Sequence, residues 1–84
     1  MNIQNAIQEG SQILRYYKCK TPLLDSEILM SKVIQKDRQF IVLNPNMIIK
    51  KDDFTIFKKL IKKRSNGKPV SYLIGRKSFW KNDF

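Results

Sequence analysis

The chain contains 84 residues with a mass of 10.0 kDa, which leaves room for one small domain and not for a two-lobed enzyme. Its 17 lysines and arginines outnumber 7 aspartates and glutamates, and the formal net charge of +10 predicts an anionic partner. With no histidine and one cysteine, the chain cannot by itself form a zinc site of the usual Cys/His type, a Ser-His-Asp triad or an internal disulfide.

The positive charge is concentrated in the second half of the chain. Residues 1–49 carry 6 basic and 4 acidic side chains, whereas residues 50–84 carry 11 basic and 3 acidic ones. The second half is therefore expected to hold the surface that meets an anionic partner.

Two features predict the compartment. The chain has no run of about 18 apolar residues and no basic-then-apolar leader. The lone Cys19 is typical of a reducing compartment. A soluble, cytoplasmic protein without a membrane partner is expected.

The first 35 residues show helical spacing. Between Asn2 and Tyr17, apolar residues recur in steps of three and four, which predicts one core-facing helix stripe: Ile3, Ala6, Ile7, Gly10, Ile13, Leu14 and Tyr17. Thr21-Pro22 is typical of an N-cap followed by proline at the first helical position. The second helix should end near Gln35, with these residues turned inward: Leu24, Ile28, Leu29, Val33 and Ile34.

A short third segment is ambiguous. Asp37 can cap a helix over Arg38 to Leu43, and Asn44-Pro45-Asn46 would stop it. Its last four residues are apolar and rich in strand formers, so periodicity alone does not separate a buried strand from a helical turn. Helix is favoured, because the segments on both sides are helical and a lone strand would lack a partner.

A fourth helix is expected over Phe54 to Arg64. Asp52 and Asp53 would lie in its first turn and lysines in its last, an arrangement that the helix dipole favours. Asn66-Gly67 should end this helix. Its apolar side is expected to hold Phe54, Phe57 and Ile61, flanked by Ile56 and Leu60.

The remaining residues change character. Pro69 is expected to begin a short fifth helix that ends before Gly75, and residues 76–84 predict a strand that enters a turn. The predicted fold is all-α: a bundle of about five helices in residues 1–75, then the first strand of a β-hairpin in residues 76–84. Phe79, Trp80 and Phe84 would be exposed in an isolated domain, so we expect them to pack against a second domain that follows.

The chain offers no convincing catalytic, cofactor or metal motif. Phe40 to Met47 partly matches an apolar strand that runs into Asn-Pro-Pro-Tyr, as in amino-methyltransferases, but the second proline and the aromatic are missing, and no glycine-rich turn precedes it. Asn44-Pro45 is therefore interpreted as a loop. The carboxylate pairs Asp52-Asp53 and Asp25 with Glu27 do not face one way on a helix, and are expected to be solvated.

The strongest charge feature is the basic face of the fourth helix. Lys58, Lys59, Lys62 and Lys63 form two pairs four residues apart, which places like charges along one side of a helix. These lysines can be interpreted as a solvated surface without a binding role. Alternatively, they can be interpreted as a surface that contacts an acidic protein surface or a phosphate backbone.

Three segments resemble the amino-terminal domain of the bacterial HemK/PrmC family. They are Thr21 to Leu29, Arg64 to Gly75, and the aromatics Phe79-Trp80 and Phe84. The most specific is the second, Arg-Ser-Asn-Gly-Lys-Pro-Val-Ser-Tyr-Leu-Ile-Gly, which fits the family's R-x-x-G-x-P-V-x-Y-L-x-G pattern. The chain departs from the family where Lys50 replaces the usual Ser/Thr cap of the fourth helix, and near the expected hairpin at Ser78 and Lys81.

The resemblance implies a function. Members of that family are S-adenosylmethionine-dependent methyltransferases that modify the glutamine of the Gly-Gly-Gln motif in class 1 peptide-chain release factors. By resemblance, residues 1–75 are the helical bundle that helps to hold the release factor, and the methyltransferase domain with its cofactor lies beyond residue 84. The family's catalytic residues match no position here. A stand-alone basic helical module that binds nucleic acid is the alternative.

Overall fold

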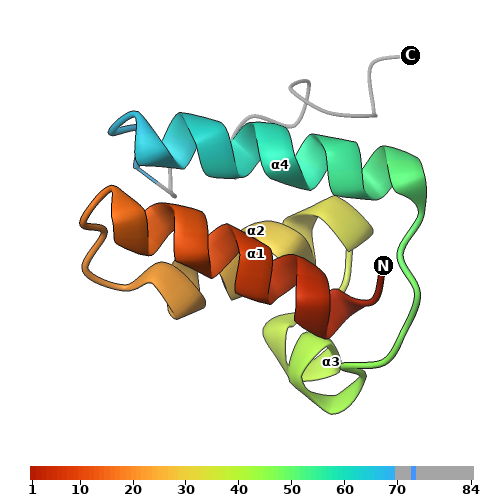
Figure 1. The fold of residues 1–84 in the computed structure, drawn as a ribbon. Helices are drawn as coiled ribbons and strands as arrows, with labels where there is room; N and C mark the ends of the chain where they lie inside the picture. The colour runs from red at the N-terminus through yellow and green to blue at the C-terminus, as the bar shows by residue number, and fades with distance from the viewer. Residues whose placement is uncertain (70–72, 74–84) are drawn as a thin grey trace.

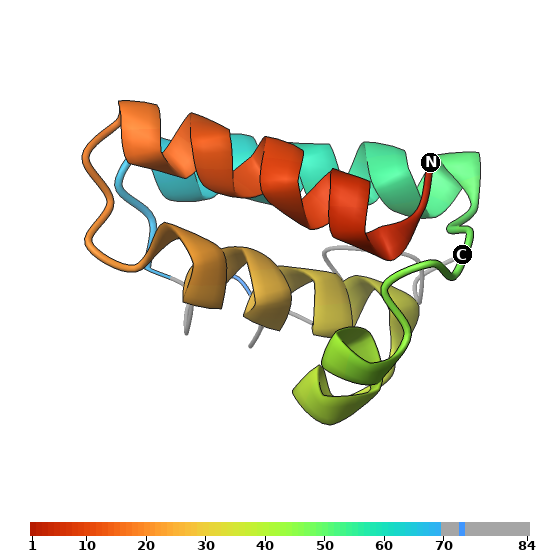
Figure 2. The same ribbon diagram turned by 60° about the horizontal axis from the view of Figure 1, so that its bottom comes forward.

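The computed structural model describes residues 1–69 and residue 73. They form four helices: α1 (Ile3–Tyr16), α2 (Pro22–Ile34), α3 (Arg38–Leu43) and α4 (Lys51–Ser65). Helices α1, α2 and α4 each contact the other two, and the short α3 packs against α2 at one end of the bundle (Figures 1 and 2). The described residues therefore confirm a mostly helical domain. Apart from Pro69 and Leu73, the expected fifth helix and the strand over 76–84 lie outside the described residues.

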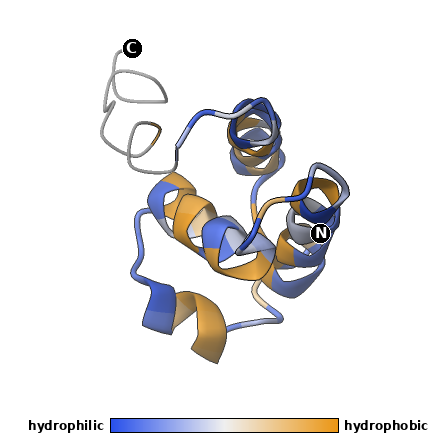
Figure 3. Ribbon diagram, turned by 90° about the vertical axis from the view of Figure 1, so that its left-hand side faces the viewer, coloured by the Kyte–Doolittle hydropathy of each residue, from blue (hydrophilic) through white to orange (hydrophobic). Residues whose placement is uncertain are grey.

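Two helix starts follow from local chemistry. The side-chain oxygen of Asn2 accepts a hydrogen bond from the Asn5 amide at 2.8 Å, and that of Asp37 accepts from the Phe40 amide at 2.8 Å. Each oxygen satisfies a backbone N–H that the first helical turn leaves without a partner. The Asp37 cap and the helical assignment of α3 are confirmed, and Figure 3 shows that α3 turns from hydrophilic to hydrophobic along its length.

One expected helix start is confirmed and another needs correction. Thr21 occupies the N-cap position and Pro22 begins α2 as predicted, although the Thr21 hydroxyl donates to Asp25 and does not cap the helix. Helix α4 begins at Lys51, a turn before Phe54, so Asp52 and Asp53 lie within its first turn as expected. At its other end Gly67 adopts a φ of +102°, which confirms that Asn66-Gly67 ends the helix.

The loop between α3 and α4 runs along the start of α1. The Ile3 amide donates to the Met47 carbonyl at 2.9 Å, and the Ile49 amide donates to the Met1 carbonyl at 3.1 Å. These bonds satisfy backbone groups at the exposed start of α1 and fix where the chain enters α4.

The core is formed mainly by α1, α2 and α4. Its fully buried members include Ile3, Leu14, Leu29, Met30, Val33, Phe57, Leu60, Ile61 and Leu73. The prediction for α2 was wrong at Leu24, which is 39% exposed, while Asp25 and Ser26 face inward. Tyr17, assigned to the core stripe of α1, is 55% exposed. None of the helices in residues 1–69 has the length and apolar character needed to cross a membrane.

Gly10 sets how closely α1 and α4 approach. A Cβ at this position would lie 2.8 Å from Cζ of Phe57 and 2.9 Å from Cδ1 of Ile61, closer than van der Waals contact allows. Both side chains are fully buried, so neither can swing into solvent to make room. Glycine is needed here for packing and not for an unusual backbone angle.

Asp25 joins three parts of the chain through one buried carboxylate. Its Oδ2 accepts from the Arg64 Nε at 2.9 Å and from the Cys19 thiol at 3.1 Å, and its Oδ1 accepts from the Thr21 hydroxyl at 3.0 Å. Asp25 is only 6% exposed, whereas the Arg64 side chain is 25% exposed. The expectation that Asp25 is solvated was therefore wrong, because a partner 39 residues away stabilises its charge below the surface.

Glu27 makes a more exposed pair. Its Oε1 accepts from the Arg38 Nε at 3.2 Å, and the Arg38 side chain is half exposed. Water screens this pair far more than the one at Asp25, so it contributes less to stability.

We expect Gly10→Val to lower the free energy of unfolding by about 1–3 kcal/mol, since the added carbons overpack the contact with Phe57. Gln12→Val on the exposed side of α1 is the matched control, with a cost of a few tenths of a kcal/mol from helix propensity alone. Urea unfolding followed by circular dichroism measures both. Equal stability of the two variants would contradict the close approach of α1 and α4.

We expect Asp25→Asn to cost about 1–3 kcal/mol of unfolding free energy, because it leaves the Arg64 guanidinium without its counter-charge. Glu27→Gln removes the same charge from the exposed pair and should cost less than about 1 kcal/mol. Urea midpoints of the two variants test the difference. A larger loss for Glu27→Gln would show that Asp25 does not hold α4 in place.

Candidate functional site

The four lysines of the predicted basic face lie on the sides of α4 that do not face the core. Because Phe57, Leu60 and Ile61 face the core, the helical period places the lysines between them on the remaining sides. Lys59 and Lys62 are exposed, whereas Lys58 and Lys63 are partly buried. The structure therefore separates the four residues into an outer pair and a pair nearer to the packed helices.

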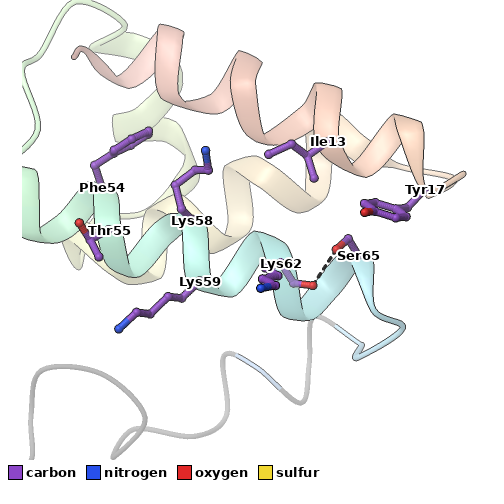
Figure 4. A pocket seen from close by; sticks show the side chains of 8 residues that line it. All are labelled: Ile13, Tyr17, Phe54, Thr55, Lys58, Lys59, Lys62 and Ser65. Atoms are coloured by element: carbon purple, nitrogen blue, oxygen red, sulfur yellow. Dashed lines mark hydrogen bonds between the residues drawn. The ribbon is translucent and has the colours of Figure 1, made fainter.

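Lys58 is already engaged within the fold. Its ammonium forms an ion pair with Glu9 of α1, and lies 5.5 Å from the centroid of the Phe54 ring. Figure 4 shows its side chain reaching toward α1, while Lys59 points away from α1. Sequence reasoning missed this pairing because Glu9 lies 49 residues earlier in the chain. Lys63 is likewise not a free charge.

A groove runs between α1 and α4 beside these lysines and encloses about 520 Å³. We call it the α1–α4 groove; eight residues line it: Ile13, Tyr17, Phe54, Thr55, Lys58, Lys59, Lys62 and Ser65 (Figure 4). Three of the four predicted lysines are among them. The sequence assigned Ile13 and Tyr17 to the core. In the structure Ile13 is partly buried against the core, and Tyr17 is 55% exposed.

The lining of the groove is suited to binding. It combines aliphatic and aromatic surface with lysines at the rim. Within residues 1–69 and 73, no group of three or more His, Cys, Asp or Glu side chains is placed to hold a metal ion. The arrangement can bury an apolar side chain and attract a carboxylate or phosphate next to it.

The other predicted site residues are not placed. Phe79, Trp80 and Phe84, expected to pack between domains, lie outside the described residues.

Two of the segments that carry the resemblance meet in space through described residues. Asp25 belongs to the segment Thr21 to Leu29, Arg64 opens the segment Arg64 to Gly75, and the two side chains are paired. Leu73 of the second segment is buried in the core. Arg64 and Leu73, two residues of the sequence pattern, thus help to hold the bundle together.

Comparisons with known proteins agree with this pattern. Release factor glutamine methyltransferases from two strains of Buchnera aphidicola are similar to this chain. The one from subsp. Baizongia pistaciae (strain Bp) is 36% identical over 84 residues, covering all of this chain and 30% of that protein. The one from subsp. Schizaphis graminum (strain Sg) is 32% identical over 80 residues, covering 95% of this chain and 28% of that protein.

The enzyme of the same name from Clostridium botulinum (strain Hall / ATCC 3502 / NCTC 13319 / Type A) is 32% identical over 79 residues, covering 94% of this chain and 28% of that protein. The chain thus spans less than a third of the length of these relatives. No solved structure matches significantly. The family model described as the PrmC N-terminal domain matches residues 5–75, and the chain therefore belongs to that family.

Proposed function

We propose that this chain is the docking domain of a release factor glutamine methyltransferase. In this proposal the complete protein acts in the cytoplasm on class 1 peptide-chain release factors and methylates N5 of the glutamine in their Gly-Gly-Gln motif. The observation that carries it is the similarity to such enzymes over nearly the whole chain, confined to under a third of their length. A helical bundle with a binding groove fits a domain that precedes the catalytic part.

The role of the bundle is to bind and orient its partner. By holding the release factor, it would raise the local concentration of the glutamine loop at the transferase domain and lower the entropic cost of reaching it. Phe79, Trp80 and Phe84 are proposed to pack against that transferase domain.

The methyl donor belongs elsewhere in the protein. S-adenosylmethionine would need a cleft such as the glycine-rich strand-to-helix turn of a nucleotide-binding sheet. Residues 1–69 and 73 form helices joined by loops, with one isolated bridge between Asn2 and Ile48, and do not fit such a cofactor. We therefore assign no step of methyl transfer to these residues.

The lysines of α4 support a contact with an acidic surface. Lys58, Lys59, Lys62 and Lys63 are proposed to face the release factor, with the exposed Lys59 and Lys62 closest to it. The net charge of +10 also favours the second candidate function, a nucleic-acid-binding module. The apolar lining of the α1–α4 groove favours a protein partner.

The chain titrated with a purified class 1 release factor should bind saturably, and the affinity should fall several-fold between about 50 mM and about 500 mM salt, because exposed charges are screened. Isothermal calorimetry measures this binding. Duplex and single-stranded oligonucleotides are the control ligands, with weak, non-saturating binding expected. Tight oligonucleotide binding with a steep salt slope, and none to the release factor, would replace this proposal with the nucleic-acid function.

A further inference from the structure

We propose that the α1–α4 groove receives one apolar side chain of the release factor, from a segment whose carboxylates pair with Lys59 and Lys62. This inference rests on the proposed function and specifies the chemistry of the docking segment. Three features of the groove support it: the apolar surface of its lining, the distribution of charge around it, and the covering of its aromatic rings by neighbouring side chains.

The lining leaves apolar surface uncovered by the described residues. Tyr17 is 55% exposed, and Ile13 and Phe54 are only partly buried although they pack against the core. The groove is open to solvent, and its volume of about 520 Å³ is large enough to receive a side chain. An apolar side chain entering here would remove this surface from water.

The charges around the groove determine which charged groups the partner should carry and where they should lie. Glu9 neutralises Lys58 on the α1 side, so the inner part of the groove has no net charge from this pair. Lys59 and Lys62 are exposed on α4, and no ion pair to either is found within residues 1–69 and 73. Carboxylates of the partner are therefore attracted to the exposed lysines of the α4 rim and not to the α1 side, where the Glu9–Lys58 pair carries no net charge. This difference sets the orientation of the bound segment.

The aromatic rings favour a protein side chain over a nucleic-acid base. The ammonium of Lys58 covers one face of the Phe54 ring at 5.5 Å from its centroid. Tyr16 meets the Tyr17 ring edge-on, with centroids 5.1 Å apart and planes at 89°. Ile13 offers no flat surface, so the groove lacks the row of open rings on which successive bases stack.

Two variants of the 84-residue chain test the proposal with a purified class 1 release factor as the probe. Lys59→Glu with Lys62→Glu reverses the rim charge and should weaken binding by about 10-fold or more. Tyr17→Ala removes the exposed wall and should weaken binding by about 5-fold or more. Circular dichroism and urea unfolding establish that both variants are folded, as expected for exposed positions.

Each variant has a matched control. Lys32→Glu with Lys36→Glu changes the net charge equally at exposed positions near the end of α2, away from the groove. Leu43→Ala removes an apolar side chain of α3 that is 68% exposed and does not line the groove. Both controls should keep the affinity within about 2-fold of the parent chain.

The outcomes separate this inference from the function it rests on. If the release factor binds and either groove variant binds as tightly as its control, the groove assignment is overturned while the docking function stands. Chemical-shift mapping on the ¹⁵N-labelled chain then identifies the face that is used instead. If the parent chain binds no release factor, both proposals fail. The parent chain could instead bind oligonucleotides, and the variant Lys59→Glu with Lys62→Glu alone could lose that binding. This result would show that the lysines bind nucleic acid, and it would overturn the inference as well.

Discussion

The buried carboxylate of Asp25 is the interaction on which the arrangement of this domain depends. It receives hydrogen bonds from the turn before α2, through Cys19 and Thr21, and from Arg64 in the last turn of α4. A charge at 6% exposure is costly unless its acceptor positions are filled, and here three donors fill them. The pairing fixes the end of α4 against α2. It thereby also positions the lysines that precede Arg64 within about two turns of the helix.

The second constraint is the contact of α1 with α4 at Gly10. Because the position lacks a Cβ, the Phe57 ring and the Ile61 side chain pack directly against the α1 backbone. Along the same two helices, Ile13 and Tyr17 face α4 without being covered, and the α1–α4 groove results. One pair of helices thus supplies both a tightly packed part of the core and an open surface, and the Glu9–Lys58 pair lies beside both.

The apolar core and one buried ion pair hold the helices together. On the surface of α4, Lys59 and Lys62 are exposed and carry positive charge. The chain belongs to a family of N-terminal domains, and the residues of its most specific segment are engaged in the fold through Arg64 and Leu73. Exposed side chains outside that segment, such as Lys59 and Lys62, can change charge at little cost to stability.

The sequence by itself determined the helical class, the caps at Asp37 and Asn66-Gly67 and the inward faces of α1 and α4, because these depend on local hydrogen bonds and on helical periodicity. It also identified the lysines and the family. Only the tertiary structure decided that Asp25 is buried and Leu24 exposed, that Glu9 neutralises Lys58, and that Tyr17 lines a groove. Each of these depends on which residues from distant parts of the chain meet, such as Asp25 with Arg64, and periodicity within one helix holds no information about its neighbours.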